Sequence, residues 1–97
     1  MAKIEENRAF PNKTADQLYQ AFESAYQKAG FQTWKLRPIG WLALARRQES
    51  GSDLHSTLSA RPGNPASATL VITSVHHSLE QLQAWAAEIW QALEETV

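Results

Sequence analysis

The sequence predicts an α+β fold in the order β-α-β-β-β-β-α, with an antiparallel sheet of about five strands and two helices packed on one face. The first indication is that residues 14–29 and 79–93 each carry an apolar stripe with helical spacing. The second is a series of alternating segments between them, joined by connections of hairpin length, which make neighbouring strands antiparallel. Because each helix has a single apolar stripe, we expect both to cover the same face of the sheet.

The two helices are delimited by matching start signals. Residues 14–17 (TADQ) and 78–81 (SLEQ) each fit a capping box, in which side chains at the first turn satisfy free backbone groups. Gly30 is the expected left-handed residue just past the first helix. The apolar stripe of that helix consists of Leu18, Phe22, Ala25 and Ala29.

Four strands are expected between the helices, and a weaker first strand precedes them at residues 3–10. Their ranges are 31–37, 41–48, 54–61 and 68–75, with turns at 38–40, 49–53 and 61–65. The register of strand 41–48 stays open, because Trp41, Ala43 and Ala45 are as apolar as Leu42 and Leu44. A shift of one residue exchanges the two faces of the strand.

Length and composition predict one domain, residues 1–97, in an intracellular, cytoplasmic protein. The 97 residues are too few for two cores, and no segment has the apolar run of a signal peptide or a membrane span. The net charge is −1, and there is no cysteine for redox chemistry or a thiolate metal site. Charge is uneven, however, with a basic excess in residues 31–75 and an acidic one in 78–97.

Motifs for catalysis are absent from the sequence. The only histidines are His55, His76 and His77, and adjacent histidines at a strand end point to opposite sides, so we expect no metal site. There is no nucleophile motif, no paired-carboxylate pattern and no glycine-rich phosphate loop. We therefore expect a protein that is not an enzyme and has no cofactor.

The element order resembles that of the TATA-box-binding-protein repeat, which is shared in larger form by helix-grip proteins such as START domains (the SRPBCC group). The resemblance spans Lys3 to about Glu95 and rests on element order and lengths. The segment Phe10-Pro11, the helix that follows it and Gly30-Phe31 are similar to small bacterial helix-grip-like domains of unknown function. The chain lacks two strands and the short second helix of the larger proteins. The resemblance implies a fold and no particular site residue.

The leading functional hypothesis is binding of an apolar small molecule between the C-terminal helix and the sheet. Large aromatic side chains can line such a cleft, or they can simply fill the core. The candidate ligand-binding residues are Phe22, Trp34, Trp85 and Trp90.

The alternative hypothesis is a protein-protein or self-association module that uses the basic open sheet face. If Leu42 and Leu44 point inward, Trp41 points outward together with several cations. The candidate interaction face then consists of Lys35, Arg37, Trp41, Arg47 and Arg61. Such a face also suits single-stranded nucleic acid, which the net charge makes the weakest of the three hypotheses.

Overall fold

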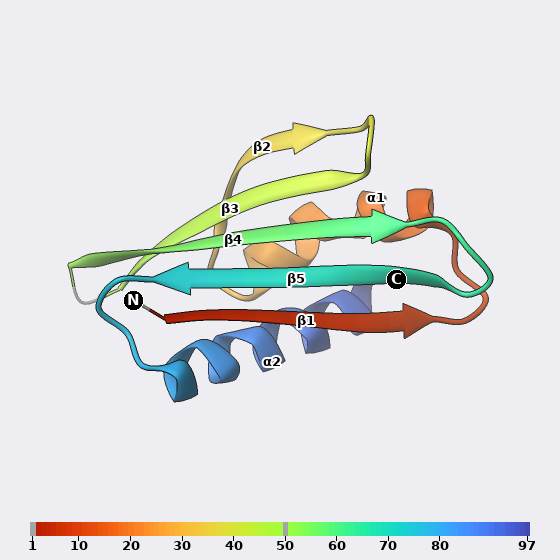
Figure 1. Ribbon diagram of the computed structural model, residues 1–97. Coiled ribbons are helices and arrows are strands. Elements are labelled where there is room, and N and C mark those ends of the chain that lie inside the picture. Colours follow the sequence, from red (N-terminus) through yellow and green to blue (C-terminus); the bar gives the residue numbers. More distant parts are fainter. Residues whose placement is uncertain (1, 50) are drawn as a thin grey trace.

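The computed structural model describes residues 2–49 and 51–97, and over these residues the elements follow the predicted order (Figure 1). The α+β fold class is therefore confirmed. Ser50, inside the predicted turn 49–53, lies outside the described residues. The elements are β1 (Ala2–Phe10), α1 (Ala15–Lys28), β2 (Gln32–Arg37), β3 (Leu42–Glu49), β4 (Ser52–Arg61), β5 (Ala66–Ser74) and α2 (Leu79–Thr96).

The strands form one antiparallel sheet in the order β1-β5-β4-β3-β2. Strands β2 to β5 are consecutive hairpins, as their short connections predict. Strand β1 pairs with β5 at the edge of the sheet opposite β2. Helix α1 follows β1 and precedes β2 in the chain, so it connects the two outermost strands. Strands β1 and β2 are consequently the two edges of the sheet.

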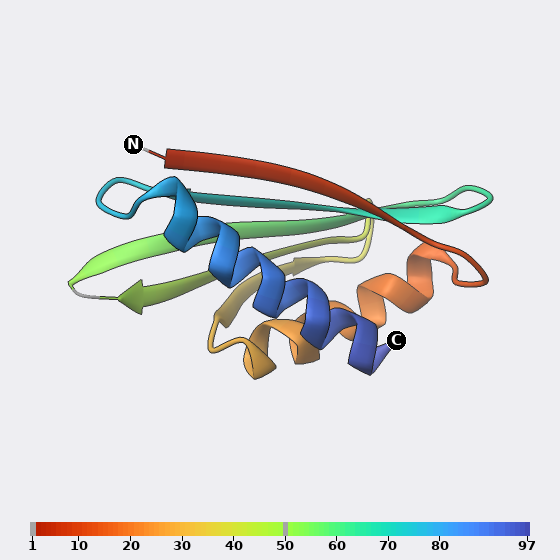
Figure 2. The same cartoon turned by 90° about the horizontal axis from the view of Figure 1, so that it is seen from below.

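Both helices lie on the same side of the sheet (Figure 2), as their single apolar stripes predict. Helix α2 packs against β1 and β5, α1 packs against β2 to β5, and the two helices contact each other. The large side chains with almost no exposed surface form the core in this space. They are Trp90, Tyr26, Phe22, Leu18, Leu54, Leu58, Leu70, Ile72, Leu82, Ile89 and Leu93.

Both helix starts have the predicted capping boxes. The Thr14 hydroxyl accepts from the Gln17 N–H at 3.1 Å, and the Gln17 side chain accepts from the Thr14 N–H at 2.9 Å. The corresponding distances between Ser78 and Gln81 are 3.2 and 2.9 Å. Gly30 has a φ of 81°, the left-handed conformation expected after α1.

The register of β3, which the sequence left open, places the alanines under the helices. Ala43 and Ala45 are 0% and 1% exposed, whereas Leu42 and Leu44 are only partly buried on the opposite face. Small residues at these two positions let α1 approach the sheet closely. The uncovered side of the sheet, called the open face below, therefore carries the even-numbered residues of β3.

One buried polar contact links α1 to the sheet. The Tyr26 hydroxyl lies 2.9 Å from the Ser56 hydroxyl, and both residues are buried. Burial raises the pKa of Tyr26 above its usual value, and the hydrogen bond with Ser56 partly offsets this effect. The neutral hydroxyl is thus the form that the folded protein favours.

We expect the folded protein to lose stability as the pH rises above about 10, the value at which tyrosine ionises in the unfolded chain. In this range the unfolded chain releases a proton that folded Tyr26 retains, because burial raises its pKa. Tyr26→Phe should weaken this alkaline loss, as measured by urea unfolding between pH 8 and 11. At neutral pH it should cost about 1–2 kcal/mol by leaving Ser56 unpaired, and Tyr26→Phe with Ser56→Ala should recover part of that cost. An unchanged alkaline loss in Tyr26→Phe would contradict this role.

Candidate functional site

The four residues predicted to line an apolar ligand site do not line a common pocket. Phe22 and Trp90 are 0% and 1% exposed and belong to the core. Trp85 is half-buried on α2, and Trp34 is 54% exposed on the edge strand β2. Five pockets among the described residues are each lined by other side chains than these four.

A bulge at Trp34 interrupts the regular alternation of β2. The pairing of β2 with β3 shifts between Thr33 and Lys35, which makes Trp34 the additional residue of a β-bulge. Leu36 pairs with the buried Ala43, but it is itself 41% exposed because β2 has a neighbouring strand on one side only. A bulge inserts one residue into the strand. The positions of β2 that pair with the buried alanines of β3 therefore change from odd-numbered (Thr33) to even-numbered (Leu36) across it.

Arg47 was predicted on the open face, but the register of β3 turns it toward the helices. Its Nη1 donates to the Ala29 carbonyl and its Nε to Glu49, each at 2.9 Å. Glu88 lies 4.0 Å from the same guanidinium, whose central carbon is 5.7 Å from the centre of the Trp85 ring. Arg47 therefore ties β3 to the end of α1 and to α2.

Trp41 is likewise not part of the open face. It is partly buried against the core, at the end of the turn between β2 and β3. Its N–H donates to the Pro38 carbonyl at 3.2 Å, and its carbonyl accepts from the Ala60 N–H at 3.0 Å. The alternative register, with Trp41 turned toward the core, is the one that the structure shows.

The open face has an apolar and basic strip along β2 and β3. Leu44 pairs with Lys35 and Leu42 pairs with Arg37, and residues paired across antiparallel strands point to the same side. Arg46 follows on the same face, opposite Gln32 and His55. We call this set, which consists of Lys35, Arg37, Leu42, Leu44 and Arg46, the basic strip. Sequence reasoning placed Lys35 and Arg37 here but missed the three β3 residues, because it left the register open.

Charge is distributed unequally between the two sides of the molecule. By register, the open face carries the cations Lys3, Lys35, Arg37, Arg46 and Arg61 and the carboxylates Glu5 and Asp53. Within residues 2–49 and 51–97, none of these five cations forms an ion pair. The glutamates of α2, on the other side of the sheet, are exposed. The open face is thus positive and the helical layer negative.

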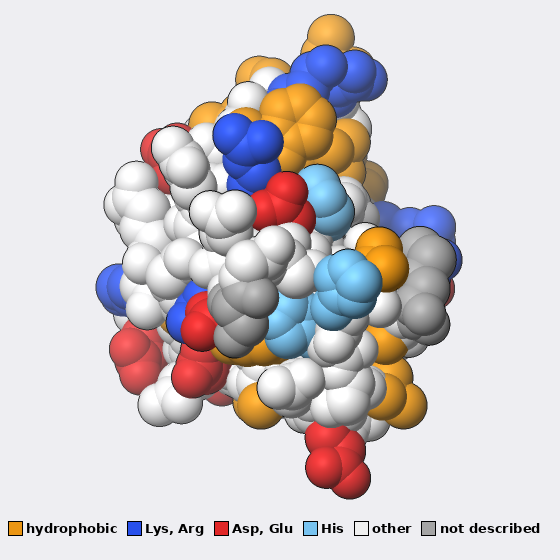
Figure 3. Space-filling view, turned by 90° about the vertical axis from the view of Figure 1, so that its left-hand side faces the viewer, with side chains coloured by type: hydrophobic (Ala, Val, Ile, Leu, Met, Phe, Trp, Pro, Cys, Tyr) orange, Lys and Arg blue, Asp and Glu red, His pale blue; other side chains and the backbone are white. Residues whose placement is uncertain are grey.

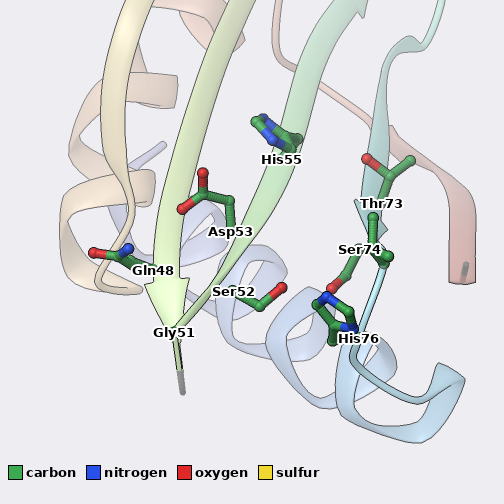
Figure 4. Close-up of a pocket in the computed structure, with 9 residues that line it drawn as sticks. Gln48, Gly51, Ser52, Asp53, His55, Thr73, Ser74 and His76 are labelled. Carbon is green, nitrogen blue, oxygen red and sulfur yellow. The ribbon is translucent and has the colours of Figure 1, made fainter.

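A second polar region lies at the end of the sheet where β5 leads into α2. Figure 3 shows the histidine side chains gathered at this end. Asp53 and His55 of β4 and Thr73 and His76 beside them line a pocket of about 420 Å³ (Figure 4). No group of three or more metal-binding side chains comes together within the described part of the chain.

His77 is paired with a serine, which the sequence spacing did not reveal. Its Nδ1 lies 2.7 Å from the Ser74 hydroxyl, which also accepts from the His77 N–H at 3.3 Å. Ser74 is 3% exposed, and the His77 ring packs edge-on against Trp85 at 5.1 Å. The buried Ser74 hydroxyl finds its hydrogen-bond partners within the same turn, at His77. The Ser74–His77 pair therefore orients the connection between β5 and α2.

Neither helix, over the described residues, is long and apolar enough to span a membrane. No model of a protein family matches the chain, and no curated protein matches it.

Among solved structures, the chain is similar to the crystal structure of protein CV1439 from Chromobacterium violaceum, a structural-genomics target. The TM-score is 0.57, with 14% sequence identity over 94% of each chain. A similarity at this level of identity shows the fold alone. The comparisons therefore support the α+β arrangement over nearly the whole chain and leave function to be argued from its surface.

Proposed function

We propose that this protein is a non-enzymatic interaction module that binds an acidic surface of a protein partner through its open face. The observation that supports this most strongly is the basic strip, where two leucines lie among three cations that form no ion pair with any described residue. A sheet face exposed only to water carries polar residues in the outward positions. Leu42 and Leu44 occupy such positions and give a partner apolar area to bury.

The two components of the strip contribute differently to binding. Each exposed ion pair with a partner is worth about 0.2–1 kcal/mol, so several together supply orientation and a faster association rate. Burial of the partly exposed leucines supplies affinity that salt does not screen, at about 25 cal/mol per Å² of apolar surface. We therefore expect binding that weakens with salt but does not disappear.

Binding of an apolar small molecule stays a prediction with less geometric support, because Phe22 and Trp90 fill the core and Trp34 lies exposed on the edge strand. Native mass spectrometry of the freshly purified protein tests it: a bound mass of a few hundred daltons would favour it, and bare protein would count against it. The resemblance to helix-grip proteins belongs to this proposal too. The element order and the likeness to CV1439 are compatible with a reduced helix-grip domain.

A titration with labelled poly-L-glutamate tests the proposed function. Fluorescence anisotropy should show binding at low salt that weakens as salt is added. Arg46→Glu should weaken it roughly tenfold, because the reversal replaces an attraction of about 0.7 kcal/mol by a repulsion of similar size. Lys28→Glu is the matched control, since it makes the same charge change on the helical side and should bind as the unchanged protein does.

Three results would overturn the proposal. They are absence of binding, equal loss in both variants, and binding of oligothymidylate as tight as that of poly-L-glutamate. The last result would assign the face to nucleic acid.

Sedimentation equilibrium adds a separate check, because the exposed glutamates of α2 could make a second copy the acidic partner. A dimer that Arg46→Glu dissociates would support the proposed face with a copy of this chain as its partner.

A further inference from the structure

The outer edge of β2 is uncovered. Among the elements, β2 contacts only β3 on one side and α1 on one face. Half of the backbone N–H and C=O groups of an edge strand point away from its neighbour, ready to pair with another chain. We propose, as an extension of the proposed function, that an acidic extended segment of a partner protein adds to β2 as a sixth strand.

The two edges of the sheet differ in a way that favours β2. Strand β1 carries both signs of charge, and its Glu6 and Arg8 are bound to α2, where Glu6 accepts from the Trp90 indole at 2.8 Å and Arg8 pairs with Glu94. Strand β2 has Lys35 and Arg37, neither ion-paired within the described residues, and no carboxylate of its own. Only the β2 edge therefore presents unbalanced positive charge to an added strand.

The pairing of β2 defines what the added strand needs. Lys35 and Arg37 point to the open face, whereas Thr33 and Leu36 point to the helical side, because their partners Ala45 and Ala43 do. Side chains of a neighbouring strand alternate in the same way. A segment that alternates acidic and apolar residues would place carboxylates beside the two cations and apolar groups beside Leu36.

Two further observations at this edge indicate a missing partner. The Thr33 hydroxyl is buried and has no hydrogen-bond partner within the described residues, and Thr33 lines a pocket of about 510 Å³. A buried hydroxyl normally has a hydrogen-bond partner. The backbone of a strand added beside β2 would bring polar groups near the Thr33 hydroxyl. In addition, Trp34, Leu36 and Ile39 are 54%, 41% and 95% exposed within one hairpin. Exposed aromatic and aliphatic anchors of this kind are typical of peptide-binding surfaces.

Charge and chemistry favour an acidic peptide over the other occupants of an edge. A second copy that paired β2 with β2 would bring the Lys35 and Arg37 side chains of both copies together, and like charges across strands are destabilising. Nucleic acid carries negative charge on its phosphates, but it has no peptide backbone to pair with the strand edge. It also has no apolar side chains to pack against Leu36 and Ile39. An acidic, alternating segment satisfies the backbone, the cations and the apolar side chains together.

The test uses the full ¹⁵N-labelled chain and a short capped peptide in which Glu and Val alternate. We expect the peptide to slow amide exchange at half of residues 32–37 by roughly tenfold, as new hydrogen bonds form at the edge. A peptide with Lys in place of Glu should not bind. Two N-methylated peptides sharpen the test: methyl groups on one set of alternate amides should abolish binding, and methyl groups on the other set should be tolerated.

Matched variants test the role of charge. Lys35→Glu with Arg37→Glu should weaken peptide binding by roughly a hundredfold, at tenfold for each reversed charge. Lys28→Glu, on the helical side of the sheet, should leave it unchanged.

The outcomes separate this inference from the proposed function. If poly-L-glutamate binds the open face while the β2 edge amides stay unprotected, or if both N-methylated peptides bind equally, the strand addition is wrong and the proposed function stands. If neither acidic probe binds, both are wrong. Protection of the same amides by self-association at high protein concentration, or by oligothymidylate alone, would also overturn the acidic peptide as the occupant.

Discussion

Replacement of Ala43 by glutamate is expected to unfold most of the protein, whereas the same replacement at the adjacent Leu44 leaves it folded. Ala43 is fully buried between Leu36 and Leu58 and faces the helical layer. A glutamate there buries an unpaired carboxylate in a space that fits a methyl group, at a cost of about 4 kcal/mol or more. That is a large part of the roughly 5–15 kcal/mol that stabilises a small domain.

Leu44→Glu is the matched control for this prediction. Leu44 lies on the open face, where a glutamate would be opposite Lys35. We expect a change of no more than about 1 kcal/mol in the free energy of unfolding, because a new cross-strand ion pair offsets part of the lost packing. Urea unfolding followed by circular dichroism measures both variants. A larger loss in Leu44→Glu than in Ala43→Glu would mean that β3 is turned the other way.

Trp90→Ala has the second large effect, an expected loss of about 3–5 kcal/mol. Trp90 is 1% exposed and is the largest of the fully buried side chains. Its ring is 6.3 Å from that of Phe10 and 5.0 Å from the Arg8 guanidinium, and its indole N–H donates to Glu6 at 2.8 Å. Truncation therefore leaves a cavity where α2 packs on β1 and removes the contacts that hold this edge of the sheet.

Trp90→Phe separates the indole hydrogen bond from the packing. A phenyl ring remains in the core, and the donor to Glu6 is lost together with the five-membered part of the indole. We expect a cost of about 1–2 kcal/mol for the lost bond and the smaller ring. Chemical denaturation of the two variants under the same conditions gives the comparison. If Trp90→Phe were as destabilising as Trp90→Ala, the hydrogen bond rather than the buried volume would hold α2 on β1.

Local chemistry explains why so much of the fold could be predicted from the sequence. The residues of each capping box are three positions apart, so Thr14 and Gln17, or Ser78 and Gln81, meet in any helix that starts there. Gly30 after an apolar stripe is a similarly local signal. Hairpin connections then determine which strands are neighbours, and one apolar stripe on each helix determines that a single sheet face is covered.

The candidate sites depended on contacts between residues far apart in the chain, which periodicity does not contain. The side of β3 that faces the helices follows from the small volume of Ala43 and Ala45 under α1, and this register moved Arg47 and Trp41 off the open face. A bulge at Trp34 reversed the expected alternation in β2. The sequence did contain one signal that Arg47 is ion-paired. Glu49 has the opposite charge and lies two residues later, and therefore on the same face of β3.

The most direct measurement compares Arg46→Glu with Arg47→Glu, each for stability and for binding of labelled poly-L-glutamate. These neighbours point to opposite sides of β3: Arg46 is exposed on the open face, and Arg47 is bound to Ala29, Glu49 and Glu88 on the helical side. We expect Arg46→Glu to weaken binding roughly tenfold with a change of at most about 0.5 kcal/mol in stability. Arg47→Glu should lose about 2–3 kcal/mol of stability and keep its binding while folded. Loss of binding in Arg47→Glu alone, or in neither variant, would contradict an open face that binds acidic partners.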